Sequence, residues 1–156
     1  DNEYLVQDIF KVINQLYLKD TFVVYGSRLI KNYKHKTHLK KIYKNNFFLY
    51  WISKVGGILI SLLILIFYNK YISDPFTSLK AFKAETIKDI NNNYKGVEYD
   101  IYQIIQLTKK RIYINEVEVN YFARSYKEGK KTNIIAGLKS LLVILRSLFS
   151  FHSKKN

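Results

Sequence analysis

Two histidines, His35 and His38, have the residue type and spacing that come closest to a metal site. Side chains three residues apart on a helix can face one ion, but a zinc site needs a third and usually a fourth ligand. The sequence has no cysteine, and residues 21–73 contain no Asp or Glu that could complete the set. Neighbouring lysines would also repel a divalent cation. We therefore expect no bound metal.

Two other pairings could support catalysis. Tyr126 and Lys130 have the Y-x-x-x-K spacing, and Glu116 and Glu118 alternate with valines, so that both carboxylates would lie on one face of a strand. The sequence has no G-x-G-x-x-G, phosphate-binding loop or H-E-x-x-H that would give either pairing a catalytic setting. Solvated charges on a strand edge explain the glutamates more simply. We predict a protein that is not an enzyme and binds no cofactor.

The charge of the chain is strongly positive and unevenly distributed. The 156 residues carry 26 Lys and Arg against 12 Asp and Glu, a net charge of +14. Acids are absent from residues 21–73 and from residues 129–156, which are also the two parts with long apolar runs. This surplus implies an anionic partner: phospholipid, nucleic acid or an acidic protein surface. Apolar runs beside charge of one sign favour membrane contact.

The longest apolar run, FFLYWISKVGGILISLLILIFYNKYI, predicts one membrane-spanning helix within residues 47–73. A helix from Tyr50 to Tyr71 would rise about 31 Å, which suits a single crossing. The alternative is a helix buried in the core of a soluble protein. Lysines and aromatic residues at both ends would anchor the helix at the two interfaces. The expected anchors are Tyr50, Trp51, Lys54, Tyr68, Lys70 and Tyr71.

Small residues form a strip along the same helix. Ser53, Gly57 and Ser61 repeat every four residues and therefore share one face. Small side chains let a second helix approach closely, so we expect helix packing there. The alternative is that small residues are simply common in membrane helices.

Basic residues crowd the segment that precedes this run. By the positive-inside rule they keep the N-terminus on the cytoplasmic or matrix side. Interleaved tyrosines would suit anionic headgroups, an acidic neighbouring subunit or RNA, and we favour the first two; a solvated cluster without a ligand is the alternative. Two further bases come from the C-terminal helix described below. The bases expected at lipid headgroups or an acidic partner are Arg28, Lys31, Lys34, Lys36, Lys40, Lys41, Lys44, Lys139 and Arg146.

The C-terminal segment, IIAGLKSLLVILRSLFSF, predicts an amphipathic helix over residues 134–151. Its bases and serines gather in a narrow wedge, and leucines fill the wide remainder of the helical wheel. A helix of this kind suits the headgroup plane, and we favour such docking over a second membrane span or a helix that binds a soluble partner.

The remaining segments predict short soluble elements. We expect helices over residues 4–19, from Asp74-Pro75 to about residue 90, and over residues 97–107. Residues 111–122 predict one strand or a hairpin that turns at Asn115 and Glu116. The chain then divides into 1–46 (amphipathic helix and basic segment), 47–73 (transmembrane helix), 74–128 (small soluble segment) and 129–156 (interfacial helix and basic tail).

The expected fold is mainly α, a membrane protein with one transmembrane helix and short soluble helices. Lys outnumbers Arg 22 to 4, which indicates an AT-rich genome such as that of a protist, an organelle or a small bacterium. We expect a non-catalytic accessory subunit of a respiratory or ATP synthase complex in the mitochondrial inner membrane, with other subunits and anionic phospholipid as partners. The alternatives are a basic RNA-binding protein of an organellar ribosome and a membrane protein of export or surface interaction.

Overall fold

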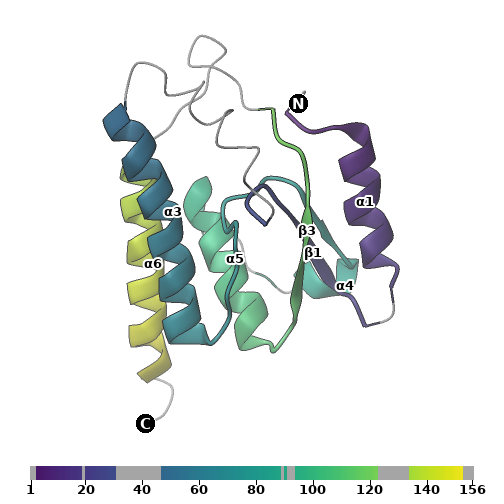
Figure 1. The fold of residues 1–156 in the computed structure, drawn as a ribbon. Coiled ribbons are helices and arrows are strands. Elements are labelled where there is room, and N and C mark those ends of the chain that lie inside the picture. Colours follow the sequence, from purple (N-terminus) through teal and green to yellow (C-terminus); the bar gives the residue numbers. More distant parts are fainter. Residues whose placement is uncertain are drawn as a thin grey trace.

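The computed structural model describes residues 3–18, 20–30, 47–88, 90, 94–122 and 134–152. In these ranges the chain forms five helices and one three-stranded sheet (Figure 1). The helices are α1 (Val6–Leu16), α3 (Phe47–Tyr68), α4 (Ala84–Ile87), α5 (Val97–Lys109) and α6 (Ile134–His152). The strands are β1 (Val23–Ser27), β2 (Lys80–Phe82) and β3 (Ile114–Glu118).

Strand β1 is the centre of the sheet. All five of its residues are buried, as expected for a short apolar strand that is covered on both faces. It pairs antiparallel with β2, Tyr25 opposite Lys80, and parallel with β3, Tyr25 opposite Glu116. The sheet order is therefore β2-β1-β3.

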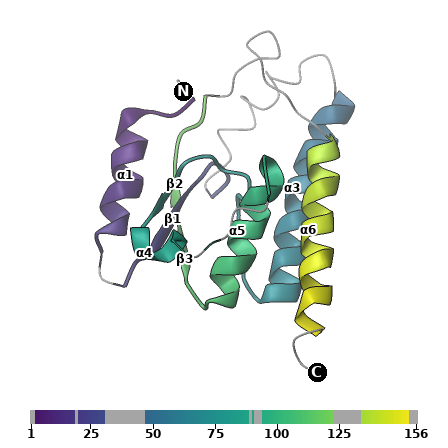
Figure 2. The same ribbon diagram turned by 180° about the vertical axis from the view of Figure 1, so that it is seen from behind.

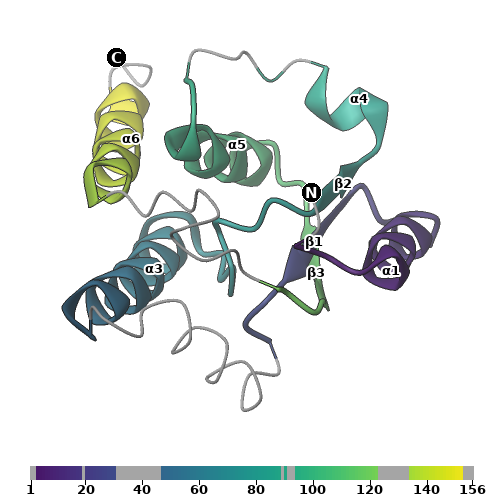
Figure 3. The same ribbon diagram turned by 90° about the horizontal axis from the view of Figure 1, so that it is seen from above.

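The helices lie in layers on the two sides of the sheet. Helix α1 covers one face, and α5 covers the other (Figures 1 and 3). Helices α3 and α6 lie side by side beyond α5, farthest from α1 (Figure 2). The alternation of side chains along β1 supplies both cores: Val23 and Tyr25 belong to the large core with α3, α5 and α6, and Val24 packs with Val12 of α1.

The predicted transmembrane helix is wrong. A helix does form there, as α3, but no helix in the described part of the chain is both long enough and apolar enough to cross a membrane. Part of the helix surface is buried inside the protein instead. Ile60 and Ile64 belong to the hydrophobic core, and Ser61 is also buried. The fold is consequently helical with a small sheet, which corrects the prediction of a mainly α membrane protein.

Two of the predicted soluble helices are confirmed, as α1 and α5, and the C-terminal helix is confirmed as α6. The long helix predicted from Asp74 is wrong: the chain makes a turn there, forms β2 and then the short α4. The Thr77 hydroxyl donates to the carbonyl of Gly26 at 2.5 Å, and Gly26 N–H donates to the carbonyl of Leu79 at 2.8 Å. These bonds align the segment with β1, and sheet pairing overrides its helical periodicity.

The predicted hairpin at Asn115 and Glu116 is also wrong. Both residues lie inside β3, which runs without a turn along β1. Beyond it, Tyr121 forms an isolated antiparallel bridge with Tyr4. The segment therefore joins the chain's own sheet and holds the beginning of α1 beside it.

Candidate functional site at the carboxyl edge of the sheet

The parallel strands β1 and β3 end at the same edge of the sheet. Ser27 is opposite Glu118 in the register, and the Ser27 carbonyl accepts a bond from Val119 N–H at 3.0 Å. In open sheets of this kind, ligands bind outside the carboxyl ends of the parallel strands. We therefore built the candidate site from the side chains that follow these two strands.

The first component is a salt bridge between Arg28 and Asp74. The guanidinium donates through Nε to Oδ2 at 2.6 Å and through Nη2 to Oδ1 at 2.8 Å, and Arg28 N–H donates to Oδ2 at 3.1 Å. The side chain of Asp74 is 3% exposed and that of Arg28 is 24% exposed. Burial lowers the pKa of Arg28, but the charge and hydrogen bonds of Asp74 outweigh it and raise that pKa overall.

The second component is an aromatic support beneath this pair. The Cζ atom of Arg28 lies 4.8 Å from the centre of the Tyr121 ring, within the range of a cation–π interaction. The Tyr121 hydroxyl donates to Glu3 Oε1 at 3.1 Å. Burial raises the pKa of Tyr121 to about 12; Arg28 opposes the rise and Glu3 adds to it. The phenol is therefore neutral at physiological pH and holds the guanidinium against the end of the sheet.

Glu116 of β3 fixes the segment that carries Asp74. It accepts bonds from Ser73 N–H at 2.9 Å, from the Ser73 hydroxyl at 2.8 Å and from Asp74 N–H at 3.2 Å. The hydroxyls of Ser73 and Ser27 are 2.6 Å apart. Glu116 is thus not the solvated edge charge that the sequence suggested. It positions the carboxylate that orients Arg28.

A second ion pair lies one strand away. Lys80 of β2 approaches Asp100 of α5, Nζ to Oδ1, at 2.6 Å and lies 4.8 Å from the centre of the Tyr25 ring. Burial lowers the pKa of Lys80 and raises the pKa of Asp100, and each partner opposes the shift of the other. Arg28 and Asp74 also contribute to both shifts, so the two pairs are within electrostatic reach of each other.

This arrangement provides one partly exposed cation, Arg28, and one buried cation, Lys80, each in an ion pair with a carboxylate. Asp74 occupies two side-chain donors of Arg28, and a guanidinium has five N–H donors. The remaining donors suit the oxygens of a phosphate, which the planar guanidinium can bind through two parallel hydrogen bonds. The segments that follow β1 and β3 along the chain are rich in bases. They hold Lys31, Lys34, Lys36, Lys40, Lys41 and Lys44, and Arg124, Lys127, Lys130 and Lys131.

The structure places only some of the bases predicted to meet lipid or an acidic partner. Arg28 is in the ion pair with Asp74, Arg146 is exposed on α6, and Lys139 lies 3.9 Å from Glu98. The six lysines between residues 31 and 44 are outside the described residues, as are the His35/His38 and Tyr126/Lys130 pairs. Their roles stay predictions. Among the described residues, no three His, Cys, Asp or Glu side chains are grouped to hold a metal ion.

The predicted anchors of α3 lie at its two ends. Lys54 Nζ is 5.2 Å from the Trp51 ring centre, the Tyr68 hydroxyl bonds to the Ser147 hydroxyl of α6, and Lys70 Nζ is 3.1 Å from the ring centre of Tyr113. Tyr71 is exposed. Tyr50 belongs to α3, but its side chain is outside the described part.

The predicted strip of small residues is only partly placed. Ser61 is buried and donates to the carbonyl of Gly57 in its own helix at 3.1 Å. A Cβ atom added to Gly57 would meet nothing within 4 Å, and the side chain of Ser53 is outside the described part. Close helix packing over the whole strip stays a prediction.

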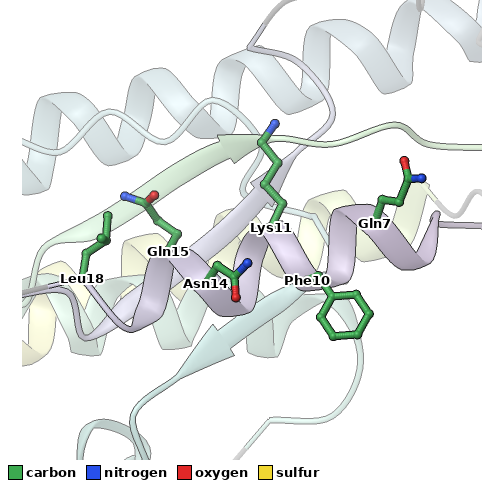
Figure 4. A pocket seen from close by; sticks show the side chains of 6 residues that line it. All are labelled: Gln7, Phe10, Lys11, Asn14, Gln15 and Leu18. Atoms are coloured by element: carbon green, nitrogen blue, oxygen red, sulfur yellow. The ribbon is translucent and has the colours of Figure 1, made fainter.

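A shallow depression on the outer surface of α1 is a poorer candidate (Figure 4). Its walls come from one helix, and its side chains spread outward without converging on a common point. The lining residues are Gln7, Phe10, Lys11, Asn14, Gln15 and Leu18. A binding site needs a few polar groups aimed at the same place, which the carboxyl edge has and this surface lacks.

Comparison with known proteins gives two distant relatives, both archaeal. The chain is 26% identical over 141 residues to the UDP-N-acetylglucosamine–dolichyl-phosphate N-acetylglucosaminyltransferase of Methanococcus voltae, covering 89% of this chain and 52% of that protein. It is 27% identical over 154 residues to an uncharacterized protein of Methanocaldococcus jannaschii, covering 96% of this chain and 58% of that one. The chain thus spans about half the length of these relatives. No family model and no solved structure matches it.

These findings overturn the predicted role and location. Neither relative is a subunit of a respiratory or ATP synthase complex by name, both come from archaea, and no described helix could span a membrane. The prediction of an accessory subunit in the mitochondrial inner membrane is therefore wrong. The similarity to a named transferase also conflicts with the prediction that the protein is not an enzyme.

Sequence reasoning missed most of the site. The sequence predicts Arg28 only as one of the bases that meet lipid headgroups or an acidic partner, and Asp74 only as the start of a helix. The available signal was local: Arg28 directly follows the apolar run FVVYGS, and Asp74 is the first acid after the acid-free residues 21–73. A buried strand followed at once by an arginine places that arginine at a strand end.

Proposed function

We propose that the chain is part of a glycosyltransferase that moves a sugar from a nucleotide donor to a lipid-linked phosphate. The observation that carries the proposal is the similarity over 141 residues to an enzyme whose name gives UDP-N-acetylglucosamine as donor and dolichyl phosphate as acceptor. Because the chain corresponds to about half of that enzyme, the activity is proposed for the complete gene product.

The geometry of the carboxyl edge supports this reaction class. Donor and acceptor both carry phosphate. Arg28 is held by Asp74 and Tyr121, and within the described ranges Asp74 takes two of its five side-chain N–H donors. Lys80, which is buried and paired with Asp100, is within electrostatic reach of Arg28. An arginine that is already oriented loses little conformational freedom when it binds a phosphate.

The reaction forms one bond and breaks one. An oxygen of the lipid phosphate attacks the anomeric carbon of the sugar. The bond from that carbon to the oxygen of the β-phosphate breaks, and the nucleoside diphosphate leaves with the electron pair. Negative charge on the leaving diphosphate grows during this step. Positive groups at the carboxyl edge would stabilise that charge or align the attacking phosphate.

A radiochemical transfer assay tests the proposal. The complete gene product is incubated in detergent with UDP-N-acetylglucosamine labelled in the sugar and with dolichyl phosphate, and the label is followed into the organic phase. We expect label in the lipid only when the lipid carries a phosphate. UDP-glucose and GDP-mannose, tested in parallel, define the donor.

The dephosphorylated lipid dolichol is the matched control acceptor. A folded protein that transfers no sugar from any of these donors to dolichyl phosphate, or that labels dolichol equally well, would contradict the proposed function.

A further inference from the structure

Helices α3 and α6 turn apolar side chains outward. On α3, Ile58, Leu62 and Ile66 are exposed over 50%, 43% and 69% of their surface. On α6, Leu138, Leu142 and Phe149 are exposed over 56%, 50% and 77%. Side chains four residues apart share a helix face, so each set forms a stripe. Stripes of this size on a protein surface usually mark an interaction site.

The two stripes belong to one surface. The inward faces of both helices, with Ile64 of α3 and Ile144 of α6, are buried in the core shared with α5. The helices are also joined by the hydroxyls of Tyr68 and Ser147. Both helices lie on the side of the molecule away from α1 (Figure 3), and the exposed side chains of each helix are on the opposite side of that helix from its buried ones. We call this surface the α3/α6 face.

The inward side of α6 is unusually polar for a buried helix face. Ser140 is fully buried and donates to the carbonyl of Ala136 at 2.9 Å, and Ser147 donates to the carbonyl of Ile144 at 2.7 Å. Both hydroxyls bond to a carbonyl of their own helix, Ser147 also bonds to Tyr68 of α3, and several leucines of α6 lie on the outside. In an ordinary amphipathic helix of a soluble domain the arrangement is the reverse.

The charged side chains of α3 and α6 are all basic, and one of them, Lys139, lies 3.9 Å from Glu98 of α5. Neither helix contains an Asp or a Glu, while Lys54, Lys139 and Arg146 lie on them. Arg146 is exposed on α6, and the side chain of Lys139 is 57% exposed. Trp51, which is also exposed, lies near the start of α3. Apolar stripes with bases and an aromatic residue are the pattern of helices that lie on an anionic bilayer.

We propose that the α3/α6 face docks the protein onto the surface of an anionic phospholipid bilayer. The leucines and isoleucines enter the boundary between headgroups and acyl chains, and the bases meet lipid phosphates. The helices lie on the membrane and do not cross it. An acidic protein is a poorer partner, because the face offers few polar groups to bind it. A second copy of this chain is also a poorer partner, because it would bring the basic side chains of two α3/α6 faces together.

Vesicle flotation tests the inference with the complete gene product, in the absence of nucleotide sugar and dolichyl phosphate. The vesicles contain phosphatidylcholine alone or phosphatidylcholine with phosphatidylglycerol. We expect binding to anionic vesicles to exceed binding to neutral ones by about tenfold or more and to weaken with added salt. The combined variant Leu62→Glu and Leu142→Glu should lower binding by a similar factor.

The matched control introduces the same charges on another exposed apolar helix. Val6→Glu and Phe10→Glu on α1, whose side chains are 66% and 60% exposed, should leave vesicle binding unchanged. Circular dichroism confirms that each variant is folded. Trp51, the single tryptophan of the 156 residues, gives a second readout. Its emission, obtained by difference from Trp51→Phe, should shift to shorter wavelength on binding.

Three results would overturn the docking proposal. The first is a folded protein that does not float with anionic vesicles. The second is equal loss of binding in the α1 control. The third is a dimer in size-exclusion chromatography that the α3/α6 variant dissociates while vesicle binding is absent. The flotation experiment contains no substrate, so a failure of sugar transfer would not affect the docking proposal. A failure of vesicle binding would likewise not affect the proposed sugar transfer.

Discussion

At the scale of single residues, the candidate site depends on charges that are buried in compensated pairs. Asp74 is almost fully buried and accepts three bonds from Arg28. Replacing both members of a buried ion pair by uncharged groups can leave the stability nearly unchanged. Removing only one member leaves an uncompensated buried charge and is destabilising. The pair is therefore useful for orientation and vulnerable to single substitutions.

The first prediction concerns the stability of this pair. Asp74→Ala should lower the free energy of unfolding by about 3 kcal/mol, because it leaves the guanidinium and the N–H of Arg28 without their acceptor. Urea denaturation measures the change. Glu85→Ala, an exposed position on α4, should change it by less than about 0.5 kcal/mol. Equal effects at the two positions would mean that the salt bridge does not hold the segment in place.

The second prediction concerns pH. Burial raises the pKa of Tyr121 to about 12, above the ordinary value of 10.0. When a pKa is higher in the folded state, the associated stability is complete below the unfolded pKa and is lost as pH rises through the folded one. The free energy of unfolding should therefore fall between about pH 10 and 12. Tyr121→Phe should make this fall shallower, and an unchanged slope would argue against the burial of this phenol.

At the scale of elements, the site is positioned by the close approach of β1 to the segments beside it. A Cβ atom added to Gly26 would lie 3.0 Å from Val119 Cγ1 and 3.1 Å from Leu79 Cδ2. Both distances are shorter than ordinary van der Waals contact, so any larger residue at position 26 would require the side chains of Val119 and Leu79 to shift by a few tenths of an ångström.

The third prediction compares two glycines. Gly26→Ala should destabilise the fold by about 1–3 kcal/mol through overpacking. Gly57→Ala, in α3, should stabilise it by about 0.5–1 kcal/mol, because alanine favours a helix and nothing lies within 4 Å of the added Cβ. Thermal denaturation of the two variants measures the contrast. A stabilising Gly26→Ala would show that β1 is not tightly packed at the site.

The elements themselves were predictable where their pattern was long and local. Helices α1 and α5 repeat apolar residues at helical spacing, and both were predicted near their observed limits. Strand β1 was not predicted. Its five residues are too few to show a periodic pattern, so the sequence does not distinguish a strand from the beginning of the basic segment that follows. The residues after Asp74 have helical spacing but pair with β1, a partner more than fifty positions away in the chain.

The environment of the apolar helix α3 could not be predicted from its sequence either. Its composition is consistent with burial in lipid and with burial in protein, and only the tertiary structure shows that Ile60 and Ile64 face a protein core. The salt bridge of Arg28 and Asp74 was equally hidden, because the two residues are 46 positions apart and meet only when the sheet forms.

At the scale of the whole molecule, the layers separate two surfaces. The carboxyl edge of the sheet carries the two ion pairs of Arg28 and Lys80, and helices α3 and α6 lie on the far side of α5 from the sheet (Figure 1). A protein docked through that face would hold its site beside the membrane, where a lipid-linked phosphate is found. The two proposals therefore fit one orientation, although each can fail alone.

The most direct test of the account is sugar transfer to dolichyl phosphate by the complete gene product carrying both Arg28→Gln and Asp74→Asn. The double variant removes both charges, so that no uncompensated buried charge remains to unfold the protein. We predict a loss of about 100-fold in kcat/KM with a melting temperature close to that of the parent chain.

Arg111→Gln is the matched control. Arg111 is exposed and lies two residues after the end of α5, in the turn that precedes β3. It should keep full activity. Unchanged sugar transfer by the folded double variant would contradict the proposed role of Arg28 in phosphate binding. Arg28 would then have a structural role only.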